Sequence, residues 1–251
     1  LGLLQDKSAP VKDRKDPLAI PGAFYNTVTC ESFPGKSGLI VIPITLDMEW
    51  VEWTPVDDGG GLVGRFRPED EEVTWAKKLA PKFGENYRTV VGADGKRVNG
   101  KNEMVETHVM YALASGDGVE WWEVVITFTS TKIKSFKKAI SAIKGYRPGD
   151  GIPLFANRLA LTSVYVPVKP DYWTTDIGAW AGNVKDSLLD PDKEEDAAIL
   201  DRAYKTYQLI KAGKVKADDE SLERAGGGGG GNGGKSTLDS QANAPGGEAP
   251  Y

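Results

Sequence analysis

The sequence predicts a mainly β protein with two helices, of the α+β class. Runs of β-branched and aromatic residues recur along the chain, Gly- and Pro-containing turns separate them, and two segments show a helical period. Residues 24–31 and 38–46 are the first such runs, and the turn-forming stretch 32–37 between them predicts a β-hairpin. The second run can extend as a strand through Trp50 and Trp53.

The next strands and the first helix follow one another directly. Residues 104–114 and 119–129 predict two strands, and Gly116 and Gly118 supply the turn of a hairpin between them. The hydrophobic period then changes from two to 3.6. The apolar residues that share one helix face, at spacings of three, four and three, are Ile133, Phe136, Ile140 and Ile143.

Further strands follow this helix at residues 158–169 and 172–180, and residues 192–213 predict a second amphipathic helix. Strands, then a helix, then more strands is the order of an OB-fold, so we expect an OB-like antiparallel β-barrel. The expected organisation is an N-terminal arm at 1–23, an OB-like β-barrel domain at 24–182 with a long inserted connection at 56–101, an acidic helical C-terminal extension at 183–224, and a flexible Gly-rich tail at 225–251.

Positive charge is concentrated in one segment of an acidic protein. The chain has a net charge of −5, yet residues 124–149 contain six bases and no acid, so the remaining 25 bases face 36 acids. A polyanion responds to such a local field, which is typical of a nucleic-acid-binding surface, although a solvated helix face has the same pattern. The six candidate phosphate contacts are Lys132, Lys134, Lys137, Lys138, Lys144 and Arg147.

Aromatic residues near this segment are candidates for stacking on bases. Trp121 and Trp122 are adjacent on a predicted strand and therefore point to opposite faces, so both enter a core only if two layers cover the strand. We select Trp121 and Tyr146 as candidate stacking residues, because base stacking and lysine contacts together make a single-strand site. The alternative is that Trp122 fills a core and Trp121 covers it.

Other chemistries have weaker support. One Cys and one His (His108) exclude a Cys/His zinc site with four ligands, and His108 fits a structural strand histidine. Residues 229–236 match a P-loop formally but lie in a glycine run without a strand and helix. Acidic clusters at 57–58, 69–72 and 190–192 could hold a metal for a nuclease. We expect no cofactor, no metal and no membrane association, because no apolar run is long enough to span a bilayer.

Several short stretches resemble single-stranded DNA-binding proteins of tailed bacteriophages and prophages. They are spread over residues 24–180: Phe24–Thr29, Gly38–Pro43, Glu106–His108, Phe128–Lys134 leading to Lys137 and Lys138, Pro153–Phe155, and Leu161 with Thr162. The resemblance implies a non-enzymatic protein of phage DNA replication and recombination that coats single strands in the host cytoplasm. Such proteins recruit replication proteins through an acidic C-terminal tail, whereas this tail holds only two acids beyond residue 225.

The hypothesis is therefore a sequence-tolerant single-stranded DNA-binding protein, with replication or recombination proteins as further partners through the C-terminal region. Whether it forms a homo-oligomer stays open. Two alternatives remain: a phage virion structural protein with extended arms, and a small metal-dependent nuclease that uses the acidic clusters.

Overall fold

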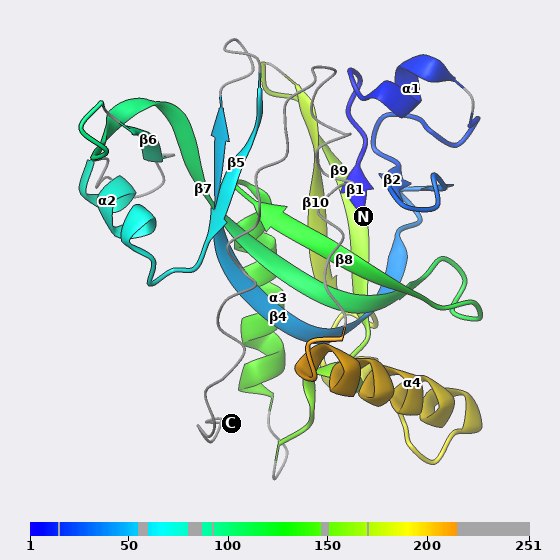
Figure 1. The fold of residues 1–251 in the computed structure, drawn as a ribbon. Helices are drawn as coiled ribbons and strands as arrows, with labels where there is room; N and C mark the ends of the chain where they lie inside the picture. The colour runs from blue at the N-terminus through cyan, green and yellow to red at the C-terminus, as the bar shows by residue number, and fades with distance from the viewer. Residues whose placement is uncertain are drawn as a thin grey trace.

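A computed structural model of the protein describes residues 1–14, 16–54, 60–79, 87–91, 93–146, 151–169 and 171–214 (Figure 1). The strands are β1 (Gly2–Leu3), β2 (Phe24–Tyr25), β3 (Ser32–Phe33), β4 (Leu39–Thr54), β5 (Gly61–Phe66), β6 (Tyr87–Val91), β7 (Arg97–Ser115), β8 (Trp122–Thr129), β9 (Leu159–Val166) and β10 (Tyr172–Ala179). The helices are α1 (Ala9–Asp13), α2 (Glu71–Leu79), α3 (Lys132–Gly145) and α4 (Glu194–Lys211), with short 3₁₀ turns at Leu154–Ala156 and Lys185–Ser187. The predicted mainly β class is confirmed.

Two long antiparallel strands, β4 and β7, form the centre of the main sheet and curve through the molecule (Figure 1). Their pairing runs from Ile40 opposite Ser115 to Trp53 opposite Glu103. On the other edge of β4, β9 pairs near its start and β5 near its end. On the other edge of β7, β6 pairs near its start and β8 near its end. The sheet therefore has two halves that share β4 and β7.

This sheet is open, so the OB-like closed barrel is not what the chain forms. Among the described strands the order is β10-β9-β4-β7-β6, with β5 and β8 attached to β4 and β7, and β10 pairs with β9 alone. β5, β6 and the first part of β7 occupy residues 61–66, 87–91 and 97–101, where we expected an inserted connection. These strands extend the second half of the sheet, and α2 packs against it through Val73 and Ala76.

The predicted hairpin of residues 24–31 and 38–46 is wrong. β2 and β3 pair with each other and β2 pairs with β1, whereas β4 pairs with β5, β7 and β9. The turn between β3 and β4 docks on β9, where Ser163 donates its backbone N–H to Gly35 O at 2.9 Å. This docking directs the chain away from β2 and into the large sheet.

The expected N-terminal arm packs on the body of the protein. Leu4 is buried, and the side-chain amide of Gln5 bonds both the N–H and the carbonyl of Trp173, each at 2.8 Å. Because Trp173 lies on the edge strand β10, these bonds occupy backbone groups that another strand would otherwise pair with. The N-terminal segment thus protects one edge of the sheet.

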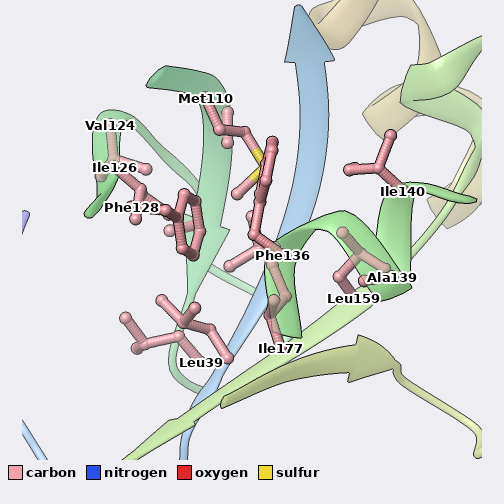
Figure 2. Packing of buried hydrophobic residues seen from close by; sticks show 14 of the residues in the cluster. Leu39, Met110, Val124, Ile126, Phe128, Phe136, Ala139, Ile140, Leu159 and Ile177 are labelled. Atoms are coloured by element: carbon pink, nitrogen blue, oxygen red, sulfur yellow. The ribbon is translucent and has the colours of Figure 1, made fainter. Parts of the chain in front are cut away.

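Helices cover both faces of the first half of the sheet. Val41 of β4 and Ala112 of β7 point to the face covered by α3, and their neighbours Ile42 and Leu113 point to the face covered by α4. This alternation is the period of two expected of a strand buried on both sides. The larger cluster, which we call the α3 core, includes Leu39, Met110, Val124, Ile126, Phe128, Phe136, Ala139, Ile140, Leu159 and Ile177 (Figure 2).

Candidate nucleic-acid interface

The candidate interface is built on α3, whose buried side fixes where its lysines lie. Phe136, Ala139, Ile140 and Ile143 are buried against the sheet, as the spacing of three and four residues predicts. The helix ends at Gly145, and the backbone N–H of Tyr146 donates to the carbonyls of Ala142 and Ile143. With this side anchored in the α3 core, the remaining sides of the helix carry the lysines.

Lys134 and Lys138 lie on the side of α3 directed away from the core. They are four residues apart, so their side chains are neighbours on the helix surface, and both are exposed. Within the described chain neither forms an ion pair with an acidic side chain. These two ammonium groups are therefore available to an anionic ligand.

Lys137 and Lys144 share a flank of the helix, because seven residues are two helical turns, and both are exposed. Lys137 donates from Nζ to Oε1 of Glu106, on β7, at 2.8 Å. The same carboxylate oxygen lies 2.7 Å from Nε2 of His108. Burial alone would raise the pKa of Glu106, but the hydrogen bonds from Lys137 and His108 outweigh it and lower the pKa below its ordinary value.

His108 is the strand histidine that the sequence predicts. Its ring lies 5.1 Å from the ring of Phe136, tilted by 38°, and its side chain is 12 % exposed. The register of β4 and β7 and the packing of α3 bring Glu106 to Lys137. In the sequence, Glu106 stands out only because residues 106–108 belong to the resemblance. Its contact with Lys137 could not be predicted, since the packing of a strand against a later helix leaves no local pattern.

Lys132, at the first position of α3, differs from the other lysines. It is partly buried, and burial lowers the pKa of its ammonium group. Tyr146 follows the helix end, two residues after Lys144, and is partly exposed. Arg147 lies outside the described residues, as does the Gly-rich tail with its P-loop-like stretch.

The structure separates Trp121 from the lysines. Trp121 packs with Ile42 and Leu113 on the face that α4 covers, and its indole Nε1 donates to Gly118 O at 3.1 Å. Trp122 points to the opposite face and stacks on Phe33 with ring centroids 4.8 Å apart. Two layers do cover this strand, so each tryptophan packs in its own core, and Trp121 and the α3 lysines do not face one another across a shared site.

The acidic clusters do not come together as a metal site in the described part of the chain. No three side chains among its His, Cys, Asp and Glu residues are placed to hold a metal ion. Residues 57–58 lie outside the described ranges, and Asp190 bonds the backbone N–H of Asp192 while Asp196 pairs with Arg158. None of the helices described has the length and apolar character needed to cross a membrane.

Comparison with known proteins gives one match. A family model described as Pam3 phage gp34-like protein matches residues 1–216. No curated protein and no solved structure matches the chain.

Proposed function

The chain belongs to the Pam3 phage gp34-like family, and from this premise we propose that it is a non-enzymatic, sequence-tolerant single-stranded DNA-binding protein that uses α3. The observation that carries the proposal is the exposed pair Lys134 and Lys138, which no described carboxylate neutralises. Their position opposite the buried side of α3 directs both ammonium groups into solvent, where a phosphate backbone can reach them.

The charge distribution favours a local contact over a general attraction. A protein of net charge −5 repels a polyanion at long range, so binding depends on a small surface where cations outnumber acids. The first turn of α4 holds Glu194, Glu195 and Asp196, and α4 lies on the other face of the sheet from α3. A strand that approaches α3 is therefore separated from these acids by the body of the sheet.

The candidate residues take different parts in this proposal. Lys134 and Lys138 contact phosphates directly, and Lys137 and Lys144 extend the cationic surface along one flank of α3. Tyr146 is the candidate for base stacking, since it is partly exposed two residues after Lys144, whereas Trp121 takes no part. Lys132, partly buried at the start of the helix, contributes less than the exposed lysines.

The test compares two double variants that remove the same charge. Lys134→Gln/Lys138→Gln changes the proposed surface, and Lys193→Gln/Lys205→Gln changes two exposed lysines in and beside α4. Fluorescence anisotropy with an oligodeoxythymidine of roughly 20 nucleotides, and with a duplex of the same length, is recorded over a series of salt concentrations. The first variant should weaken single-strand binding and reduce the salt slope by about 1.4, at about 0.7 per phosphate, while the second should match the parent.

Two results would refute the proposal. The first is a parent protein that does not bind the single strand, or that binds the duplex equally well. The second is an equal loss of affinity in both double variants, because this would make net charge rather than α3 responsible.

The proposal also assigns a cellular setting and further partners. We place the protein in the cytoplasm of the host cell during phage DNA replication and recombination, where single strands are exposed. The acidic helical extension is the proposed contact for replication or recombination proteins. A pull-down that compares the parent with Glu194→Gln/Glu195→Gln, which changes two exposed acids of α4, tests this role.

A virion structural role is the second candidate, and exposed apolar residues in the N-terminal region favour it. Leu18 and Ile20 are 50 % and 58 % exposed, and Val28 in the turn between β2 and β3 is 70 % exposed. In a particle, such exposed apolar side chains would be available for contacts with neighbouring subunits. Mass spectrometry of purified phage particles distinguishes the two functions, since a structural protein is retained in the particle in stoichiometric amounts.

A further inference from the structure

The helices α2 and α3 cover the same face of the sheet, and the residues between them range from buried Trp50 to partly exposed Glu106. Alternate residues of β7 point to this face: Met104 packs with Val73 and Ala76 of α2, and Met110 belongs to the α3 core. Glu106 and His108 lie between these two positions and point to the same face. Their partners on β4 are Trp50 opposite Glu106 and Met48 opposite His108. We call these four residues, Met48, Trp50, Glu106 and His108, the interhelical strip.

A lysine from each helix reaches this strip. Nζ of Lys77, on α2, lies 4.7 Å from the centre of the Trp50 ring. Nζ of Lys137, on α3, lies 2.8 Å from Oε1 of Glu106. Since Trp50 and Glu106 are direct partners across β4 and β7, the two ammonium groups lie over adjacent positions of one sheet face. Two separate helices therefore each supply a cation to this part of the sheet.

The strip carries one partly exposed carboxylate. The Glu106 side chain is 30 % exposed and holds Lys137, whose own side chain is 54 % exposed. At the α2 end, the carboxylate of Glu52 is buried and accepts a hydrogen bond from Asn102 at 3.0 Å, so it lies below the surface. Glu106 is thus the acidic group that competes with an incoming anion for Lys137.

We propose that a single strand of nucleic acid crosses the sheet along the interhelical strip, with its phosphates bound by Lys77 and Lys137, and that Glu106 occupies the phosphate position in the free protein. This inference rests on the proposed function. It adds a second helix, α2, to the binding surface, and it assigns Glu106 as a carboxylate that competes with the phosphate for Lys137. A phosphate oxygen accepts the same Lys137 hydrogen bond as the carboxylate, and Glu106 then keeps His108 as its remaining partner.

The experiment uses the full chain and four single variants in matched pairs. Lys77→Gln is compared with Lys205→Gln. Lys205 lies on α4, where its Nζ is 2.6 Å from Oδ2 of Asp201. Glu106→Gln is compared with Glu123→Gln, which removes the carboxylate that pairs with Arg202 at 2.9 Å on the α4 side. Affinity for a fluorescent oligodeoxythymidine is measured by anisotropy across a salt series, and thermal unfolding of each variant is followed by circular dichroism.

Lys77→Gln should weaken binding roughly threefold or more and reduce the salt slope by about 0.7, and Glu106→Gln should strengthen binding by a similar factor. Both control variants should match the parent. If Lys77→Gln lowers the unfolding temperature, Lys77→Arg keeps the cation and should bind as the parent does.

The inference is overturned if Lys77→Gln binds like Lys205→Gln, or if Glu106→Gln binds no more tightly than Glu123→Gln. Those results leave the proposed function standing when Lys134→Gln/Lys138→Gln still weakens binding. A parent that does not bind the single strand overturns both the function and the inference.

Discussion

The ring of Phe136 on α3 stacks on the ring of Phe128 on β8, with centroids 4.6 Å apart and planes tilted by 27°. Both side chains are 3 % exposed or less. The pair joins the helix that carries the lysines to the sheet, and Figure 2 shows Phe136 directed from α3 into the core beside Phe128. The position of the candidate interface therefore depends on this contact.

Replacing Phe136 by Ala should destabilise the protein by about 3–5 kcal/mol, because it removes buried apolar surface and leaves a cavity under α3. Val119→Ala, at a position that is 79 % exposed, serves as the control and should change stability by less than about 0.5 kcal/mol. Urea unfolding monitored by circular dichroism measures both. A loss below about 1 kcal/mol for Phe136→Ala would mean that α3 does not depend on this packing.

Gly35 should not tolerate a side chain. A Cβ added at Gly35 would lie 1.7 Å from the carbonyl oxygen of Gly22 and 2.3 Å from Oγ of Ser163. Gly35→Ala therefore requires the turn between β3 and β4 to move away from β9, and we expect a loss of roughly 1–3 kcal/mol. Gly178→Ala is the matched control, since a Cβ there meets no atom within 4 Å. Equal unfolding midpoints for the two variants would contradict the close approach of this turn to β9.

Glu106→Gln should change how stability depends on pH. The folded protein holds the pKa of Glu106 below its ordinary value, so its contribution is present above the unfolded pKa of about 4.3 and is lost as pH falls through the lower folded pKa. Because the ion pair with Lys137 is partly exposed, the parent should exceed the variant by no more than about 1 kcal/mol near pH 7.

The difference between the parent and Glu106→Gln should then shrink as the pH is lowered from about 5 to about 3. Urea unfolding at a series of pH values measures it. A stability difference that stays constant over this range would show that Glu106 has the same affinity for protons in both states.

Trp121→Phe should lower stability without changing affinity for single-stranded DNA. The substitution removes the hydrogen bond from Nε1 to Gly118 O and part of the packing against the α4 side of the sheet, for about 1–2 kcal/mol. Anisotropy titrations at one salt concentration should agree with the parent within about twofold. A loss of affinity as large as that expected for Lys134→Gln/Lys138→Gln would show that Trp121 contributes to binding.

Local patterns in the sequence predicted local structure well. The spacing of Ile133, Phe136, Ile140 and Ile143 predicts α3, and the turn at Gly116 and Gly118 predicts the β7–β8 hairpin, because each depends on residues close in the chain. The pairing of β4 with β7 and with β9 depends on partners distant in the sequence. For that reason local patterns did not predict the open sheet or the partners of β4, and the closed barrel and the first hairpin were wrong.

The candidate site was predictable in part for the same reason. Helical spacing alone places Lys134 and Lys138 opposite the buried side of α3. The sequence has no local pattern that shows which face of the sheet α3 covers. It therefore could not predict that Trp121 lies on the other face from the lysines, or that Lys137 contacts Glu106. Lys77 had no local signal in the sequence, because only the register of β4 and β7 places Trp50, which it contacts, opposite Glu106.

Lysine acetylation read out by mass spectrometry shows whether α3 contacts a single strand, because it compares individual lysines of the unmodified full chain. The protein is labelled with and without a saturating oligodeoxythymidine. If α3 binds the strand, the oligonucleotide protects Lys134 and Lys138, while Lys193 and Lys205, beside or in α4, react as before. Equal reactivity of Lys134 and Lys138 in both samples, or equal protection of all four lysines, would contradict binding by α3.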